Sequence, residues 1–228
     1  MICGIRIRRS YREMYKAVLF DMDGTVLDTV GDLTDAINVS LEKFGFPARS
    51  QEEVKSFLGK GPAHFVNCAV PEGTDAATKQ QVLAFYEPYY DSHCQIRTAP
   101  YPGIMDLLKT LKARGIRLAV ISNKQEPAVK ALAEQHFAGL LELAVGTSPR
   151  IRCKPDPSAV LAAMAELGVE KEETLYVGDM DVDLNTARNA GIDCVGVAWG
   201  FLGRKKLEAL GAERIADNTE QLLEFILK

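Results

Sequence analysis

The chain has 228 residues, of which 47% are hydrophobic and 25% charged, and its formal net charge is −4. This composition is ordinary for a globular protein, and the acidic balance argues against a general nucleic-acid binder. No apolar run reaches the ~18 residues of a membrane span, and no apolar segment of a signal peptide follows the basic first residues. Five scattered cysteines without a CxxC pair indicate free thiols, so we expect a cytoplasmic protein.

The first predicted strand, Ala17–Phe20, follows a basic leader of residues 1–15. An apolar run this short is typical of a buried strand. Asp21 and Asp23 come directly after it, where open α/β sheets bind ligands. Two carboxylates this close repel each other, and the cost is tolerated when a metal ion lies between them. The stretch therefore predicts a metal-dependent site at the end of this strand.

Residues 29–99 carry helical patterns and no predicted strand. The signals are, in chain order, an apolar face from Leu33 to Phe44, a capping box at Ser50 and Glu53, Pro62 in the first turn of a third helix, and a helix over about 74–91. An all-helical insertion directly after the first strand predicts a small bundle over the edge of a sheet.

From about residue 100 onward, strands and helices alternate, which predicts a parallel, doubly wound α/β sheet. We expect strands over 117–121, 143–146, 175–177, 194–198 and 215–216. Leu161 is expected to face inward from a helix, and Thr219 to cap the last helix. Prolines around Lys154 predict an extended loop. The predicted division is thus a core of residues 16–28 and 100–228, with residues 29–99 inserted.

Polar side chains follow three of the predicted strands. Besides the two aspartates of the first strand, the candidates are Ser122, Asn123, Asp179, Asp181 and Asp183, with Lys154 in its separate loop. The carboxyl ends of parallel strands meet at one edge of a sheet, so these groups can converge. Carboxylates with few other ligands suit Mg²⁺ shared with a phosphate, a hydroxyl and a lysine suit phosphate oxygens, and an aspartate can attack phosphorus.

This combination resembles the haloacid dehalogenase (HAD) superfamily of aspartate-nucleophile phosphatases over about residues 16–228. FDMDGTVLD, VISN, CKPDPS and VGDMDVD are similar to its four motifs, and the helical insertion is similar to its C1 cap. FLGKGPAHFV, YPGIMDLLKTLKARG and WGF resemble its phosphoglycolate phosphatases. The resemblance implies a HAD-type Rossmann-like core and a Mg²⁺-dependent hydrolase of a small-molecule phosphate ester, 2-phosphoglycolate first of all. The oligomeric state stays open between a monomer and a homodimer.

The resemblance assigns roles to the strand-end residues. Asp21 would attack phosphorus and become phosphorylated, while Asp23 would protonate the leaving group and then activate water. Mg²⁺ would be held by the carboxylates of Asp21 and Asp179 and by the backbone carbonyl of Asp23. Ser122 and Asn123 would bind the transferred phosphoryl group.

Three further residues would support this chemistry. Lys154 would neutralise charge between Asp21 and the phosphate, since an ionised nucleophile repels a dianion. Thr25 is expected to support Asp23, and Asp183 to hold waters of the metal.

The helical insertion is expected to close over the substrate and exclude water. Lys60, flanked by Gly59 and Gly61, would then reach a substrate carboxylate, with His64 one turn further on. The alternative for Lys60 is a solvated surface lysine.

Other functions compatible with these motifs are a sugar-phosphate mutase similar to β-phosphoglucomutase and an inorganic pyrophosphatase. Thr25 favours hydrolysis, because mutases of the superfamily tend to carry another residue there. Cleavage of a carbon–halogen bond needs no second acid, so Asp23 argues against it. A non-catalytic binding protein would be expected to have lost Asp21, Asp23 or Lys154, and all three are present.

Overall fold

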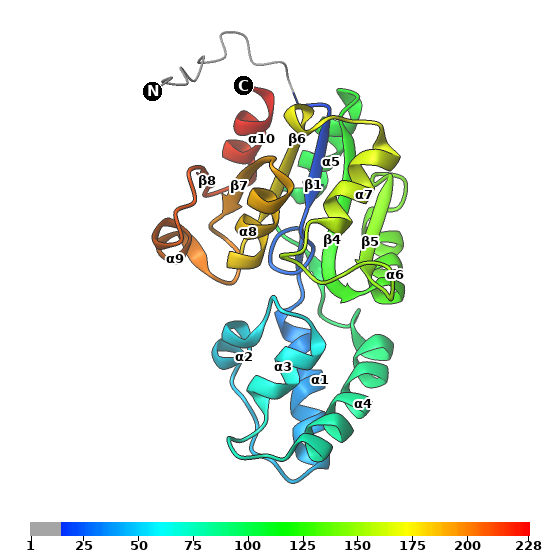
Figure 1. Ribbon diagram of the computed structural model, residues 1–228, viewed down its shortest axis with the longest axis vertical. Coiled ribbons are helices and arrows are strands. Elements are labelled where there is room, and N and C mark those ends of the chain that lie inside the picture. The colour runs from blue at the N-terminus through cyan, green and yellow to red at the C-terminus, as the bar shows by residue number, and fades with distance from the viewer. Residues whose placement is uncertain (1–14) are drawn as a thin grey trace, which may run out of the picture.

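The computed structural model describes residues 15–228, so the predicted basic leader lies outside the described residues except for Tyr15. A six-stranded sheet has the order β5-β4-β1-β6-β7-β8, and every neighbouring pair is parallel (Figure 1). The strands are β1 (Ala17–Phe20), β4 (Arg117–Gln125), β5 (Leu143–Thr147), β6 (Thr174–Gly178), β7 (Asp193–Val197) and β8 (Ile215–Ala216). This confirms the predicted doubly wound α/β fold.

Strand β1 lies in the middle of the sheet and is buried on both faces. Val18 and Phe20 join one core cluster, and Ala17 and Leu19 join another, because successive side chains of a strand point to opposite faces. The flanking helices are α5 (Ile104–Ala113), α6 (Glu126–Phe137), α7 (Ser158–Leu167), α8 (Asp181–Ala190), α9 (Gly203–Ala209) and α10 (Thr219–Leu227), with a 3₁₀ turn at Lys171–Glu173. Both layers hold β1 rigidly, and with it the residues that follow β1.

Four helices lie together below the sheet in Figure 1. They are α1 (Val30–Lys43), α2 (Gln51–Phe57), α3 (Pro62–Ala69) and α4 (Ala76–His93), and we call them the helical block. The capping box of Ser50 and Glu53 and the first-turn position of Pro62 are both confirmed. Among the described residues, none of the helices is both long and apolar enough to cross a membrane.

The sequence did not predict the connection between the helical block and the sheet. Strands β2 (Leu27–Asp28) and β3 (Ala99–Pro100) pair antiparallel where the chain leaves and re-enters the sheet-containing part. Beside them the buried carboxylate of Asp32 accepts hydrogen bonds at 2.9–3.1 Å from three successive backbone N–H groups, those of residues 96–98. The expectation of no strand in residues 29–99 is therefore wrong at Ala99.

Several local predictions differ from the structure. Leu161 is 39% exposed, because the inward face of α7 is formed by its small and apolar neighbours instead. Asn218, not Thr219, caps α10, since its side chain accepts the N–H of Gln221 at 2.9 Å. The Lys154 loop is a turn rather than an extended segment, with the Asp156 N–H donating to the carbonyl of Cys153.

Strand β4 is longer than predicted and reaches Gln125, with a register shift between Ile121 and Gln125. Ser122 and Asn123 consequently lie within the last part of the strand rather than after it. The edge strand at 215–216 is confirmed. The four cysteines of the described residues, at positions 68, 94, 153 and 194, are all free.

Candidate active site

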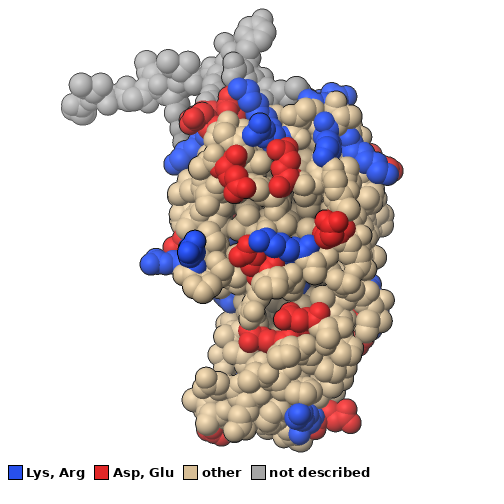
Figure 2. Space-filling view, turned by 90° about the vertical axis from the view of Figure 1, so that its right-hand side faces the viewer, with Lys and Arg blue, Asp and Glu red and all other residues tan. Residues whose placement is uncertain are grey.

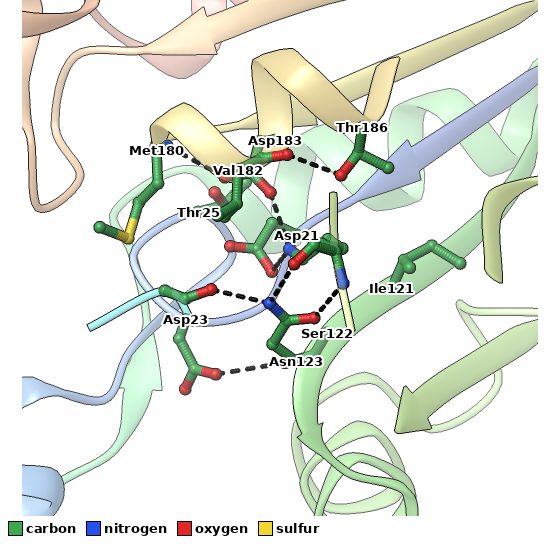
Figure 3. A network of polar contacts seen from close by, with 12 residues as sticks. Asp21, Asp23, Thr25, Ile121, Ser122, Asn123, Met180, Val182, Asp183 and Thr186 are labelled. Carbon is green, nitrogen blue, oxygen red and sulfur yellow. Dashed lines mark hydrogen bonds and ion pairs between the residues drawn. The ribbon is translucent and has the colours of Figure 1, made fainter. Parts of the chain in front are cut away.

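The carboxyl edge of the sheet brings together the polar groups at the ends of β1, β4 and β6 (Figure 3). Asp21 is fixed at the end of β1 by its N–H, which donates to the carbonyl of Val177 at 2.8 Å. The Lys154 ammonium lies 2.6 Å from Asp21 Oδ1 and 2.7 Å from Asp183 Oδ1, and its side chain is almost fully buried. The loop lysine and the strand-end carboxylates therefore form one buried ionic cluster.

Three carboxylates of this cluster fit a metal ion. One oxygen each of Asp21, Asp179 and Asp183 lies within 4.8 Å of the others, and all three side chains are buried. Lys154 is the cation that touches two of them, so the cluster keeps an excess of negative charge. Oxygen ligands in such an arrangement are those that Mg²⁺ prefers.

The raised pKa values of the carboxylates in this cluster also favour a bound cation. Burial, followed by the charge of Asp183, raises the pKa of Asp21 to about 7, although Lys154 opposes the rise. Burial and the charge of Asp21 raise the pKa of Asp179 well above its ordinary value. Burial lowers the pKa of Lys154, but the charges of Asp183 and Asp21 outweigh it and raise that pKa well above the usual value. A divalent cation would relieve the repulsion among these carboxylates.

Backbone and hydroxyl donors hold the carboxylates of β6 and α8 in place. Asp179 accepts the hydroxyl of Thr25 at 3.0 Å and the N–H of Phe201 at 2.7 Å. Thr25 was expected to support Asp23, but its hydroxyl supports Asp179 instead. Asp183 accepts the N–H groups of Asp179 and Met180 at 3.2 and 3.0 Å while it pairs with Lys154, which locks the side chain beside the other two acids.

A glycine is required where the first loop passes Asp179. Gly24 has φ +86°, and a Cβ there would lie 2.4 Å from Asp179 Oδ2. Any side chain at this position would therefore displace the carboxylate, which explains why a glycine follows the aspartate pair.

Asp23 faces the end of β4. Ser122 donates its hydroxyl to Asp23 Oδ2 at 3.3 Å and accepts the N–H of Lys124 at 3.1 Å. The ammonium of Lys124 lies 3.1 Å from Asp23 Oδ1. Sequence reasoning missed Lys124, although it directly follows the predicted pair of residues 122–123.

Asn123 connects three segments of the chain. Its amide nitrogen donates to the carbonyl of Gly59 at 2.8 Å and to that of Lys154 at 3.2 Å, and its amide oxygen accepts the Lys154 N–H at 2.6 Å. The side chain therefore holds the lysine loop and the helical block against β4.

A cavity of about 80 Å³ lies between the sheet edge and the helical block. The sheet side supplies Asp21, Asp23, Ser122, Asn123, Lys124, Gln125, Lys154, Met180 and Phe201. The helical side supplies Leu33, Leu58, Gly59, Gly61, Pro62, Phe65, Tyr86, Glu87, Tyr90 and Asp91. Charged groups thus cluster on the sheet side, while apolar and aromatic groups form most of the opposite wall.

Lys60 does not reach this cavity. It lines a second one with His64 and Asp181, and its ammonium lies 3.9 Å from Asp181. Its neighbours Gly59 and Gly61 do line the first cavity. The predicted contact of Lys60 with a substrate near Asp21 is therefore not supported, and Asp181 lies beside Lys60 at the second cavity.

Comparison with known proteins identifies the family of this chain. Residues 18–197 match the model of the haloacid dehalogenase-like hydrolases. The chain is 34% identical over 215 residues to a phosphoglycolate phosphatase of Pseudomonas putida, covering 91% of this chain and 78% of the relative. It is also 34% identical over 222 residues to a phosphoglycolate phosphatase of Rhodospirillum rubrum, covering 93% and 91%.

A solved structure shows the same arrangement. The crystal structure of a proposed phosphoglycolate phosphatase from Lactobacillus delbrueckii subsp. bulgaricus superimposes with a TM-score of 0.90 at 38% identity. The match covers 94% of this chain and 99% of that one, so it includes the helical block as well as the sheet.

Proposed function

The chain belongs to the haloacid dehalogenase-like hydrolases, and we propose that it is a Mg²⁺-dependent phosphatase that hydrolyses 2-phosphoglycolate through an aspartyl-phosphate intermediate. The observation that carries the proposal is the buried contact of Lys154 with Asp21 and Asp183, beside Asp179 at the carboxyl edge of the sheet. The relatives named as phosphoglycolate phosphatases support the choice of substrate.

Asp21 is the proposed nucleophile. Its side chain lies at the end of β1, a strand buried on both faces, and Lys154 at 2.6 Å both orients it and offsets its charge as the phosphate dianion approaches. Asp21, Asp179 and the Asp23 backbone carbonyl are the proposed ligands of Mg²⁺, with Asp183 beside them. The ion would supply charge neutralisation for the transferred phosphoryl group.

Asp23 is the proposed general acid and base. The Ser122 hydroxyl at 3.3 Å holds it at the cavity, and protonation of the leaving oxygen followed by proton abstraction from water would use the same carboxylate in turn. Ser122 and the backbone N–H of Asn123 are proposed to bind the phosphoryl oxygens. The Asn123 amide nitrogen is already engaged by two carbonyls.

We propose that the helical block acts as a cap over the sheet edge. The cap of the predicted division consists of residues 29–99. Besides the Asn123–Gly59 contact, Gln125 donates to Glu87 of α4 at 2.6 Å, and both contacts support a closed position of the block against the sheet. The cavity between the block and the sheet is the proposed place of the phosphate ester, and closure of the block would limit the access of water to the intermediate.

Phosphate release from a panel of substrates tests the proposal. The panel contains 2-phosphoglycolate, other small phosphomonoesters, a hexose phosphate and pyrophosphate, each with Mg²⁺ or with EDTA. We expect 2-phosphoglycolate to lead by at least tenfold in kcat/KM, or ~1.4 kcal/mol of transition-state discrimination, and EDTA to abolish turnover. Isomerisation of the hexose phosphate without phosphate release, or activity that survives EDTA, would contradict it.

A further inference from the structure

Lys124 of β4 is a buried cation that the proposed chemistry does not use. Its side chain is 8% exposed. Besides the ion pair with Asp23, its ammonium donates to the hydroxyl of Tyr90 on α4 and lies 4.2 Å from the centre of that ring. Lysine is almost never buried to this degree without charged or polar partners. Its position between the acid of the first loop and the helical block therefore indicates an electrostatic task in the cavity.

Lys124 is the cation of this cavity that remains for a second negative charge. Of the residues that line the cavity within 15–228, only Lys124 and Lys154 are cationic. Lys154 is already held by Asp21 and Asp183 at 2.6 and 2.7 Å. Lys124 is paired with one carboxylate, that of Asp23, so a substrate carrying a carboxylate as well as a phosphate would meet Lys124 as its counter-charge.

The helical wall, as the described residues form it, offers no cationic partner to a carboxylate. Its charged members are Glu87 and Asp91, which would repel one, and the rest of that wall is mainly apolar or aromatic. Lys60 faces the second cavity. On the face drawn in Figure 2, acidic side chains also lie on the helical part just below the narrowing of the molecule. A carboxylate taken out of water here needs a paired cation, because an unpaired buried charge costs several kcal/mol.

We propose that Lys124 is a specificity-determining residue that binds the carboxylate of the substrate once the helical block is closed; this rests on the proposed function. An ammonium has three N–H donors, so it keeps one for a carboxylate beside its contacts with Tyr90 and Asp23. Because Tyr90 belongs to α4 and Lys124 to β4, this binding site is complete only in the closed arrangement. Binding of the substrate carboxylate is thereby coupled to closure of the helical block.

The test compares two esters that differ in one group. 2-Phosphoglycolate carries a carboxylate where 2-hydroxyethyl phosphate carries a hydroxymethyl group. In Lys124→Met we expect the ratio of kcat/KM for the charged over the neutral ester to fall at least about tenfold, mainly through KM for 2-phosphoglycolate. Lys124→Arg should keep the ratio within about threefold of the wild type, since the charge remains.

Lys60→Met is the matched control. It also removes a lysine, but Lys60 lines the second cavity and not the one beside Asp21. Its ratio should equal that of the wild type. Thermal melts check folding, and Lys124→Gln replaces Lys124→Met if the latter does not fold. An equal loss of both esters in the Lys124 variants, or a collapsed ratio in Lys60→Met, would overturn the proposal.

Failure of the proposed function is visible earlier and separately. It shows in the wild type, as absence of phosphate release or of any preference for 2-phosphoglycolate. Failure of the Lys124 proposal shows only in the variants, as a ratio that does not change.

Discussion

The sheet edge and the helical block face the same cavity but contribute different things to it. From the sheet come charged side chains whose positions are held by hydrogen bonds, such as Lys154 between Asp21 and Asp183. From the helical block come mainly apolar and aromatic side chains, and the Gly59 carbonyl that meets Asn123. The difference teaches that hydrogen bonds and ion pairs of the sheet part hold the charged groups, whereas the helical block mainly supplies the apolar and aromatic wall opposite them.

This comparison separates two kinds of kinetic effect. Changes at the sheet edge should lower kcat, because they remove groups that stabilise the transition state. Changes in the helical block should act mostly on KM, because they alter how the substrate is enclosed. The variants below test that separation.

Asp21→Asn should have the largest effect. Loss of the nucleophile is expected to lower kcat by at least about 10³-fold, as removal of covalent nucleophiles does in other enzymes. Stability should hold, because the amide is isosteric and removes a charge that Asp183 repels. Steady-state phosphate release measures kcat, with Asp35→Asn on α1 as a control. More than a tenth of wild-type turnover would rule out the covalent mechanism.

Lys154→Met should reduce both activity and stability. Asp21 and Asp183 would be left as uncompensated buried charges, which costs roughly 3–5 kcal/mol. Urea unfolding at neutral pH measures this loss. Addition of Asp183→Asn to the variant should restore part of the stability without restoring turnover, and full recovery of turnover would show that the lysine acts only on folding.

Mg²⁺ should raise the Tm, and more at pH 7.5 than at pH 5.5. Asp21 has its pKa raised from 3.8 to about 7 in the folded chain, so protonation stabilises the metal-free fold. That contribution is complete below pH 3.8 and is lost as the pH rises through about 7. Binding at 100 times Kd adds ~2.7 kcal/mol. Thermal melts with Mg²⁺ or EDTA check this, and an equal Tm shift at both pH values would contradict the placement of the metal beside Asp21.

Gly59→Ala and Gly73→Ala form the mildest test. Both glycines belong to the helical block and have positive φ, +97° and +83°, so alanine at either should cost about 1 kcal/mol. A Cβ at Gly59 would also lie 2.7 Å from Met180 Sδ, whereas one at Gly73 meets no heavy atom within 4 Å. We therefore expect a KM several-fold higher in Gly59→Ala alone. Equal KM values in the two variants would show that this contact does not control closure.

The strand-end residues were predictable because their signal is local. An apolar run followed at once by a polar group marks the end of a buried strand, and parallel topology then places Asp21, Ser122 and Asp179 at one edge. The structure brings these residues together, and the family match supports the same fold. Lys154 was grouped with them from its proline-bounded loop, which carries no such strand-end signal, and its role came from the resemblance.

The residues that sequence reasoning missed depend on contacts between distant segments. Lys124 contacts Tyr90 on α4, and the hydroxyl of Thr25 donates to Asp179, 154 residues further along the chain. Lys60 faces away from Asp21 within a turn where Gly59 and Gly61 both adopt positive φ. Periodicity along one segment contains none of this information, because it is set by how the helical block sits on the sheet.

The paired strands β2 and β3 have a consequence for how such a molecule can be rebuilt. They place Asp28 opposite Ala99, and the Asp32 carboxylate ties the first turn of α1 to residues 96–98. The two ends of the segment between β2 and β3 therefore lie side by side, at a two-stranded pair outside the six-stranded sheet. We therefore expect that another insert, or a tight turn joining the two short strands, can replace this segment without a change in the pairing register of β1, β4 and β6.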